Sequence, residues 1–237
     1  MYKKKIKIGI IVGLEREKKL LNKTDFLIVE AGYNKNSIKA TKKILKNDVD
    51  VVVSLGLAGS IDKNLKNGEI IIPSFIVNHQ KKRFTSEKFS KLFISILNIQ
   101  QKFNQGLYTS NKIENLNTLN KLNKIKNVSA VDMESFYILE ESRNKKIPFC
   151  CIRVIFDDLN FNIPRFIGKS IDENGKVIFK KLIEGILKEP QNIGSLFVMF
   201  KYYLRAKTNL KKVSRALSNI NGQPILSFSL WISFSIF

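Results

Sequence analysis

Acidic side chains gather at a few points of an otherwise basic chain. Asp132 and Glu134 lie in the segment SAVDMES, and Asp157 and Asp158 directly follow the apolar run PFCCIRVIF. Glu17 lies in GLEREKK, just after another apolar run. Ligands of open α/β sheets bind at the carboxyl ends of the parallel strands. Carboxylates collected there, without a His/Cys ligand set for a metal, indicate acid–base chemistry on a neutral or cationic substrate.

Each of these signals also has a purely structural explanation. Ser129 and Asp132 have the spacing of a helix capping box, and Glu17 could be a solvated charge at a helix start. Gly56 and Gly59 could be required only by a tight turn. The order of the signals along the chain, rather than any one of them, favours a functional site.

Apolar runs and stretches of helical spacing alternate along the chain, which is typical of an α/β fold. We expect a single domain with a central mixed, mostly parallel twisted sheet flanked by helices. The sequence predicts strands at residues 6–14, 26–30, 49–55, 69–77, 106–109 and 148–156, and helices at 36–47, 87–99 and 131–145. The glycine-rich GLAGS segment is expected to be a turn, and most of residues 78–128 a polar stretch.

The end of the chain has a different character. Residues 176–217 predict two helices broken at Pro190 and Gly194, and we expect residues 1–217 to form the domain with this segment as a basic amphipathic extension. Its cations suit an anionic membrane surface. A core helix with a solvated basic face would explain them equally well. The cations are Lys201, Arg205, Lys207, Lys211 and Lys212. Residues 218–237 are expected to be an apolar tail, too short in its apolar part to span a bilayer.

The chain carries 41 Lys and Arg against 20 Asp and Glu, a net charge of +21. Such a charge suits nucleic acid or an anionic membrane, but no nucleic-acid-binding motif is present and we expect no nucleic-acid partner. A lysine-rich composition imposed by an AT-rich genome is the competing explanation. Adjacent Cys150 and Cys151 should not form a disulfide, so we expect a cytoplasmic protein, peripheral to the inner membrane face if the basic helix binds there. We expect no metal and no cofactor.

Four blocks of the sequence resemble the nucleoside phosphorylase/nucleosidase superfamily, which includes the methylthioadenosine/S-adenosylhomocysteine nucleosidases. They are GIIVGLEREKKLL, VVVSLGLAGSIDKNLKNGEIIIP, VDMES and PFCCIRVIFDD, in the family's order. The segment SLGLAGSID, the VDMES block and the stretch from residue 172 to 217 are similar to the hopanoid-biosynthesis branch, which removes adenine from adenosylhopane. The resemblance implies a nucleoside phosphorylase-like fold, an enzyme that cleaves a purine N-glycosidic bond, and a homo-oligomer.

The resemblance also implies roles for individual residues. Asp157 matches the general acid that protonates N7 of adenine, and Glu17 matches the glutamate that activates the attacking water. Glu134 would hold the ribose hydroxyls and Met133 would pack on the ribose. Further substrate contacts are implied at Ala58, Gly59 and Phe156. Arg153, within the last strand, either orients these acids or forms a buried structural ion pair.

The nature of the acceptor stays open at this level. Phosphate as co-substrate needs several charge-assisted donors, and Arg16 is the nearby candidate. The expected substrate is a small or lipid-linked adenine nucleoside. The alternatives are a soluble nucleoside of the methylthioadenosine type, or a non-catalytic relative that binds a membrane or an acidic partner.

Overall fold

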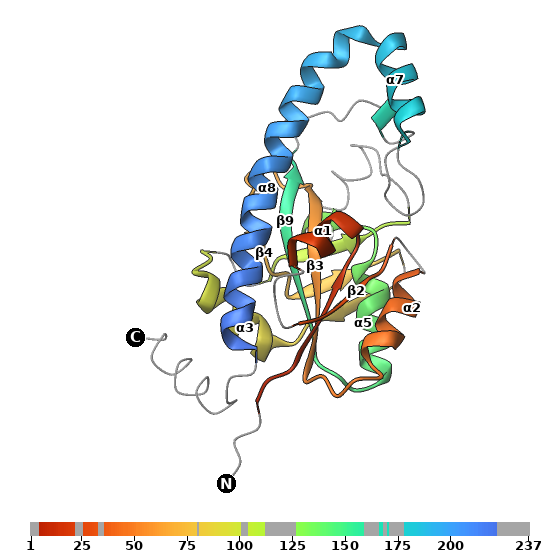
Figure 1. The fold of residues 1–237 in the computed structure, drawn as a ribbon. Helices are drawn as coiled ribbons and strands as arrows, with labels where there is room; N and C mark the ends of the chain where they lie inside the picture. Colours follow the sequence, from red (N-terminus) through yellow and green to blue (C-terminus); the bar gives the residue numbers. More distant parts are fainter. Residues whose placement is uncertain are drawn as a thin grey trace.

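The computed structural model describes residues 5–21, 26–32, 36–79, 81–100, 104–111, 127–158, 166–167, 170 and 178–221. Its centre is a mixed sheet with helices on both faces (Figure 1), which confirms the predicted α/β fold class. The strands are β1 Ile8–Val12, β2 Leu27–Glu30, β3 Val51–Ser60, β4 Ile70–Ile71, β5 Phe75–Val77, β6 Lys82–Phe84, β7 Gly106–Thr109, β8 Val128–Asp132 and β9 Phe149–Asp157. The helices are α1 Glu15–Leu21, α2 Asn36–Ile44, α3 Glu87–Leu97, α5 Ser135–Asn144, α7 Phe179–Lys188 and α8 Ile193–Ile220.

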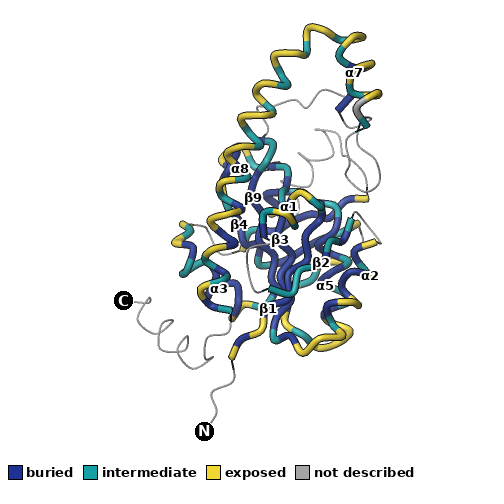
Figure 2. The backbone as a smooth tube through the Cα atoms, viewed as in Figure 1, coloured by how far each residue is buried: buried dark blue, intermediate teal, exposed yellow. Residues whose placement is uncertain are grey.

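The sheet is ordered β2-β1-β3-β8-β7-β5-β6. Off this path, β9 pairs with β3 along nearly its whole length, from Val52 to Gly59, and also with β4. Strands β1, β3 and β9 are parallel neighbours. Their apolar runs predict strands covered on both faces, and Figure 2 shows these strands as the buried centre of the molecule.

Each face of the central strands has its own core. Val53 and Ile152 pack with residues of α1, α3 and α8, whereas Val52 and Ile155 pack with residues of α2 and α5. The alternation of side chains along a strand produces this division. It also separates the two cysteines, and both are buried and free, as predicted.

Three local predictions were wrong. GLAGS is not a turn, because β3 continues through it to Ser60. The strand predicted at residues 69–77 is divided into β4 and β5 around Pro73, which has no backbone N–H for a sheet hydrogen bond. The helix predicted from residue 131 begins at Ser135, after β8, and β6 was not predicted at all.

Helix α8 has two distinct halves. From Ala206 onward it buries Leu210, Val213 and Leu217 against the body, but before Ala206 it buries none of its side chains and extends away from the sheet (Figure 1). The predicted division into two helices near Pro190 is confirmed, since α7 ends at Lys188 and α8 begins at Ile193, but Gly194 lies inside α8 and does not break it. No described helix is both long enough and apolar enough to cross a bilayer. The tail predicted at residues 218–237 lies outside the described residues from 222 on.

Candidate active site

Glu17 is fixed at the carboxyl ends of β1 and β3. Its carboxylate accepts hydrogen bonds from the backbone N–H of Leu14 at 2.9 Å and of Leu57 at 2.9 Å. The side chain is 6% exposed. Burial raises the pKa of Glu17, although the two backbone donors oppose this shift. The interpretation of Glu17 as a solvated helix-start charge was therefore wrong.

The glycines of β3 leave space for carboxylates. A Cβ on Gly56 would lie 2.9 Å from Oε1 of Glu17, and one on Gly59 would lie 3.1 Å from both carboxylate oxygens of Asp157. Distances this short are tighter than ordinary carbon–oxygen contacts, so a side chain at either position would displace an acid. The tight-turn explanation was wrong, since both glycines lie in a strand.

A buried ion-pair network anchors the acids. The guanidinium of Arg153 is fully buried and binds Asp132 through Nη2 at 2.7 Å and Nε at 3.1 Å. The same Nη2 lies 3.2 Å from Oε1 of Glu134. Asp132 accepts a further bond from the Thr109 hydroxyl at 2.7 Å. Both interpretations of Arg153 thus apply, because it forms a buried ion pair and that pair positions Glu134.

The capping-box interpretation of Ser129 and Asp132 was wrong. Both residues lie in β8, where the Ser129 hydroxyl donates to the Gly106 carbonyl. Asp132 instead accepts from the backbone N–H of Ser135, the first residue of α5.

Asp132 and Glu134 share one guanidinium, and the Glu17 carboxyl lies close enough to feel its charge, so the cluster carries excess negative charge if all three acids are ionised. Burial raises the pKa of Glu134 to about 8; Arg153 opposes this shift, and Asp132 and Glu17 add to it. A buried carboxyl beside other carboxylates keeps its proton. The folded site therefore holds at least one proton near neutral pH.

This proton makes the stability of the fold depend on pH. The folded-state pKa of Glu134, about 8, exceeds the ordinary value of 4.5, so folding takes up a proton between these two values. The free energy of unfolding should therefore fall as pH rises from about 5 to 8, by up to about 1.4 kcal/mol per pH unit for one proton. We expect Glu134→Gln to flatten this slope in thermal unfolding measured across that range. Glu87→Gln, which alters an exposed pair with Lys91, should keep the wild-type slope; equal slopes for all three proteins would contradict the prediction.

The two adjacent aspartates have different surroundings. An irregularity in the β3–β9 pairing, at Phe156, places Asp157 opposite Gly59. Burial raises the pKa of Asp157 to about 6, and the charge of Asp158 adds to this shift. Asp158 accepts from the backbone N–H of Asn67 at 3.2 Å and lies 3.5 Å from the Tyr202 hydroxyl, so it connects β9 to a loop and to α8.

The other predicted site residues lie in different environments. Met133 is half-buried and its N–H donates to Glu134, and Ala58 is buried in the core on the α2 and α5 side. Phe156 packs against the core on the opposite face. Arg16 is exposed on α1.

The sequence matches the model of the phosphorylase superfamily over residues 13–184. The match includes β3, β9 and all the acids of the site. The chain belongs to the phosphorylase superfamily. This confirms the predicted superfamily, and the predicted enzyme class, an N-ribosyl hydrolase or phosphorylase, agrees with it. No curated protein matches the chain.

Solved structures of nucleosidases share the superfamily fold seen here. Futalosine hydrolase of Helicobacter pylori superposes with a TM-score of 0.66 at 16% identity, covering 90% of this chain and 97% of that one. The 5'-methylthioadenosine/S-adenosylhomocysteine nucleosidase of Neisseria meningitidis, in complex with methylthio-immucillin-A, gives 0.65 at 17% identity, covering 90% and 99%.

Some residues of the site had no signal in the sequence. Ser54 and Ser135 each receive a hydrogen bond from Arg153, at 2.8 and 2.7 Å, and Thr109 holds Asp132. Ser54 is 99 residues from Arg153 in the chain. A buried guanidinium must have hydrogen-bond acceptors for its N–H groups. The sequence therefore indicates that Arg153 has acceptors, but it does not indicate which residues they are.

Proposed function

We propose that the protein cleaves the N-glycosidic bond of an adenine nucleoside. The observation that supports this most strongly is the arrangement of acids along β3. Glu17 lies against Gly56, beside the Arg153–Glu134 pair, and Asp157 lies against Gly59. Glu17 comes from α1, Asp157 from β9 and Glu134 from the junction of β8 and α5, so only the assembled fold brings Glu17 and Asp157 against β3 and Glu134 to Arg153.

Each acid has a suitable task in this reaction. Asp157, with a pKa of about 6, retains a protonated fraction near neutral pH and donates that proton to N7 of the leaving adenine. Glu17, held by two backbone amides, accepts a proton from the attacking nucleophile. Glu134 binds the ribose hydroxyls and, while ionised, stabilises the positive charge that develops on the sugar.

We propose water as the nucleophile. Arg153, the guanidinium of this cluster, is already bound by Asp132 and Glu134. Phosphate would meet several carboxylates here and needs several charge-assisted donors of its own. A hydrolase is therefore the better match, and phosphate is the alternative co-substrate.

Release of free adenine from purified protein tests the proposal. We expect release from adenosine or methylthioadenosine, with free ribose or its thioether as the second product, at a rate that added inorganic phosphate leaves unchanged. If the second product were a sugar 1-phosphate, the reaction would be phosphorolysis and not hydrolysis. Absence of adenine release from these nucleosides and from adenosylhopane would contradict catalysis and favour a non-catalytic relative.

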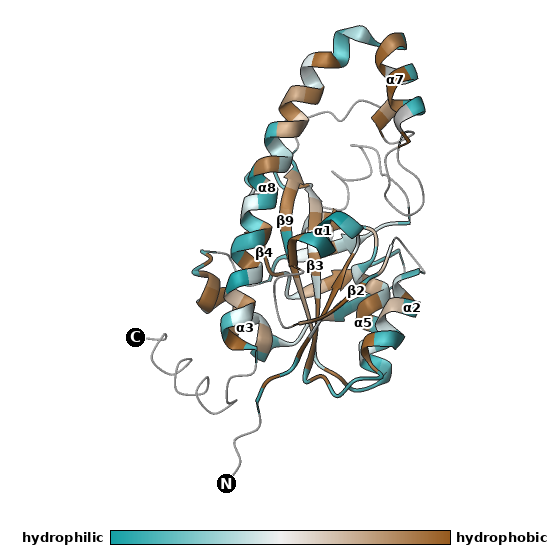
Figure 3. Ribbon diagram, viewed as in Figure 1, coloured by the Kyte–Doolittle hydropathy of each residue, from teal (hydrophilic) through white to brown (hydrophobic). Residues whose placement is uncertain are grey.

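A lipid-linked nucleoside such as adenosylhopane is the finer proposal, and the exposed half of α8 supports it. Large apolar side chains are exposed on α7 and on this half, including Leu187 at 75%, Phe197 at 68% and Phe200 at 58%. Figure 3 shows apolar residues along this part of the molecule, interspersed with hydrophilic ones. Lys201 is exposed on the same half of α8. Aromatic and basic side chains together suit the surface of an anionic bilayer.

The lipid proposal has its own test, separate from catalysis. Phe197→Ser with Phe200→Ser should reduce sedimentation with phosphatidylglycerol vesicles and slow cleavage of adenosylhopane held in them. Cleavage of dissolved adenosine should not change, because both side chains are exposed on the part of α8 that buries no side chain. If the double variant bound vesicles as well as the wild type does, the lipid proposal would be contradicted and a soluble nucleoside would be the proposed substrate.

A further inference from the structure

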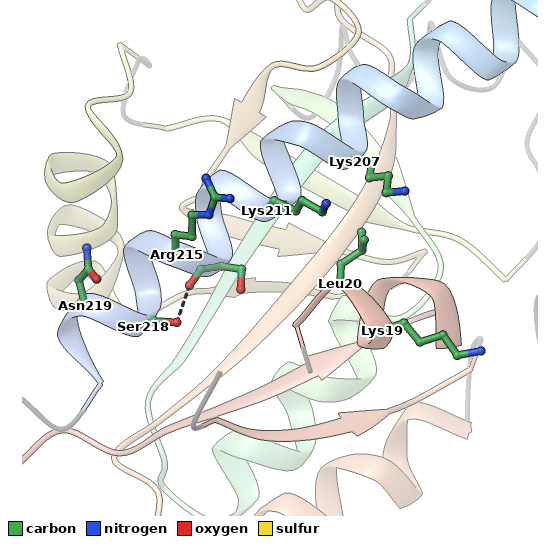
Figure 4. A pocket seen from close by; sticks show the side chains of 8 residues that line it. Lys19, Leu20, Lys207, Lys211, Arg215, Ser218 and Asn219 are labelled. Carbon is green, nitrogen blue, oxygen red and sulfur yellow. Dashed lines mark hydrogen bonds between the residues drawn. The ribbon is translucent and has the colours of Figure 1, made fainter. Parts of the chain in front are cut away.

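A groove lies between α1 and the packed half of α8, outside the acid cluster (Figure 4). Its volume is about 530 Å³, within the roughly 300–1,000 Å³ usual for small-molecule sites. Four of its eight lining residues are cations and none is acidic. The cations are Lys19 from α1 and Lys207, Lys211 and Arg215 from α8.

The cations of α8 are concentrated by the helix itself. Lys207, Lys211 and Arg215 are spaced four residues apart, so they lie on one face of α8 and repel one another. The neighbouring contacts offset this positive charge only weakly. Glu15 pairs with Lys19 at 2.9 Å, and the Lys207 ammonium lies 5.9 Å from the centre of the Tyr203 ring. An anion in the groove would remove the repulsion along α8.

Neutral polar side chains complete the lining. Ser218 and Asn219 line the same groove from the last turn of α8. The Ser218 hydroxyl already donates to the Ser214 carbonyl at 3.0 Å, so its oxygen is engaged within the helix. An arginine fork binds phosphate through two parallel hydrogen bonds, and lysine ammonium groups bind it as point charges. The groove thus has the side chains that recognise phosphate, whereas the acid cluster would repel it.

We propose that this groove binds a small molecule carrying two or more phosphate groups. The number of cations and the volume both exceed what a single phosphate requires. The ligand could be a free oligophosphate or the phosphorylated headgroup of a lipid, because both present the same chemistry to the groove. The site is independent of the proposed cleavage reaction, since none of its lining residues belongs to the acid cluster.

The test must distinguish specific binding in the groove from the nonspecific attraction of any anion to a chain with a net charge of +21. The groove variant is Lys207→Gln with Lys211→Gln. The control is Lys42→Gln with Lys212→Gln, which removes the same charge from exposed positions outside the groove. Binding of tripolyphosphate is measured by calorimetry at about 0.15 M salt, where surface charges are screened beyond about 8 Å. We expect the groove variant to lose at least about tenfold in affinity and the control less than about threefold.

Vesicles of cardiolipin, a lipid whose headgroup carries two phosphate groups, identify the source of the phosphate. If the groove variant also sediments less with vesicles than the control does, the ligand is a lipid headgroup. If only tripolyphosphate binding is lost, the ligand is a soluble oligophosphate. Equal losses for both variants, or no tripolyphosphate binding by the wild type, would overturn the proposal. Adenine release from adenosine serves as a folding check and should be retained by both variants.

Discussion

Asp157→Asn is expected to reduce kcat/KM for adenine release by about 10²- to 10⁴-fold, the usual contribution of a positioned general acid. Asparagine has nearly the same shape and fits against Gly59, but it has no acidic proton for N7 of the base. Because the protonated form is the active one, wild-type kcat/KM should fall as pH rises through the Asp157 pKa of about 6. The residual activity of the variant should lack this decline.

Asp158→Asn is the matched control. Its amide oxygen can still accept from the Asn67 N–H and the Tyr202 hydroxyl, so activity should stay within a few-fold of wild type. Thermal unfolding shows whether either variant has lost structure. If Asp158→Asn were inactive and Asp157→Asn were active, the acid would be the neighbouring residue and the proposed alignment of β9 would be wrong by one position.

The second large effect is expected for Glu17→Gln, again about 10²- to 10⁴-fold in kcat/KM. Glutamine cannot take a proton from the nucleophile. It also has only one acceptor oxygen, and Glu17 accepts from both Leu14 and Leu57. One backbone N–H would then face an N–H₂ group, which should lower the free energy of unfolding by about 1–3 kcal/mol.

Glu15→Gln on the same helix separates the two causes. Glu15 pairs with Lys19 at the surface of α1, and its loss should leave adenine release within about twofold of wild type. Binding of a transition-state analogue such as methylthio-immucillin-A, measured by calorimetry, then tests whether the Glu17 variant still has a formed site. Normal kcat with only a raised KM would show that Glu17 binds substrate instead of activating a nucleophile.

The central sheet could be predicted from sequence because β1, β3 and β9 are buried on both faces and read as apolar runs. β8 could not, because Ser129 and Asp132 interrupt its apolar pattern and are satisfied by Gly106, Thr109 and Arg153, which are distant in the chain. GLAGS was mistaken for a turn because glycine usually indicates one. In this protein the glycines instead leave space for carboxylates that arrive from α1 and β9.

The candidate acids were found because each lies near a strand end or helix start visible in the sequence. Arg153 was visible as a lone charge in an apolar run, but its partners were not. The sharing of one guanidinium by Asp132 and Glu134, and the resulting proton on the cluster, depend on distances of about 3 Å that only the assembled fold fixes. The groove cations were recognised in sequence only as a basic helix face.

The two halves of α8 differ in the tertiary contacts that stabilise their helical conformation. The half from Ala206 onward is part of the hydrophobic core, so its backbone hydrogen bonds should open only when the whole domain unfolds. The preceding half has about the length at which an isolated helix is marginal in water, and it has no buried side chain of its own. A single continuous helix therefore spans two cooperative units. Its turns before Tyr202 can fray and re-form while Tyr202 keeps its bonds to Asp158 and Asn67, and whatever covers the exposed aromatics would also determine how often those turns are helical.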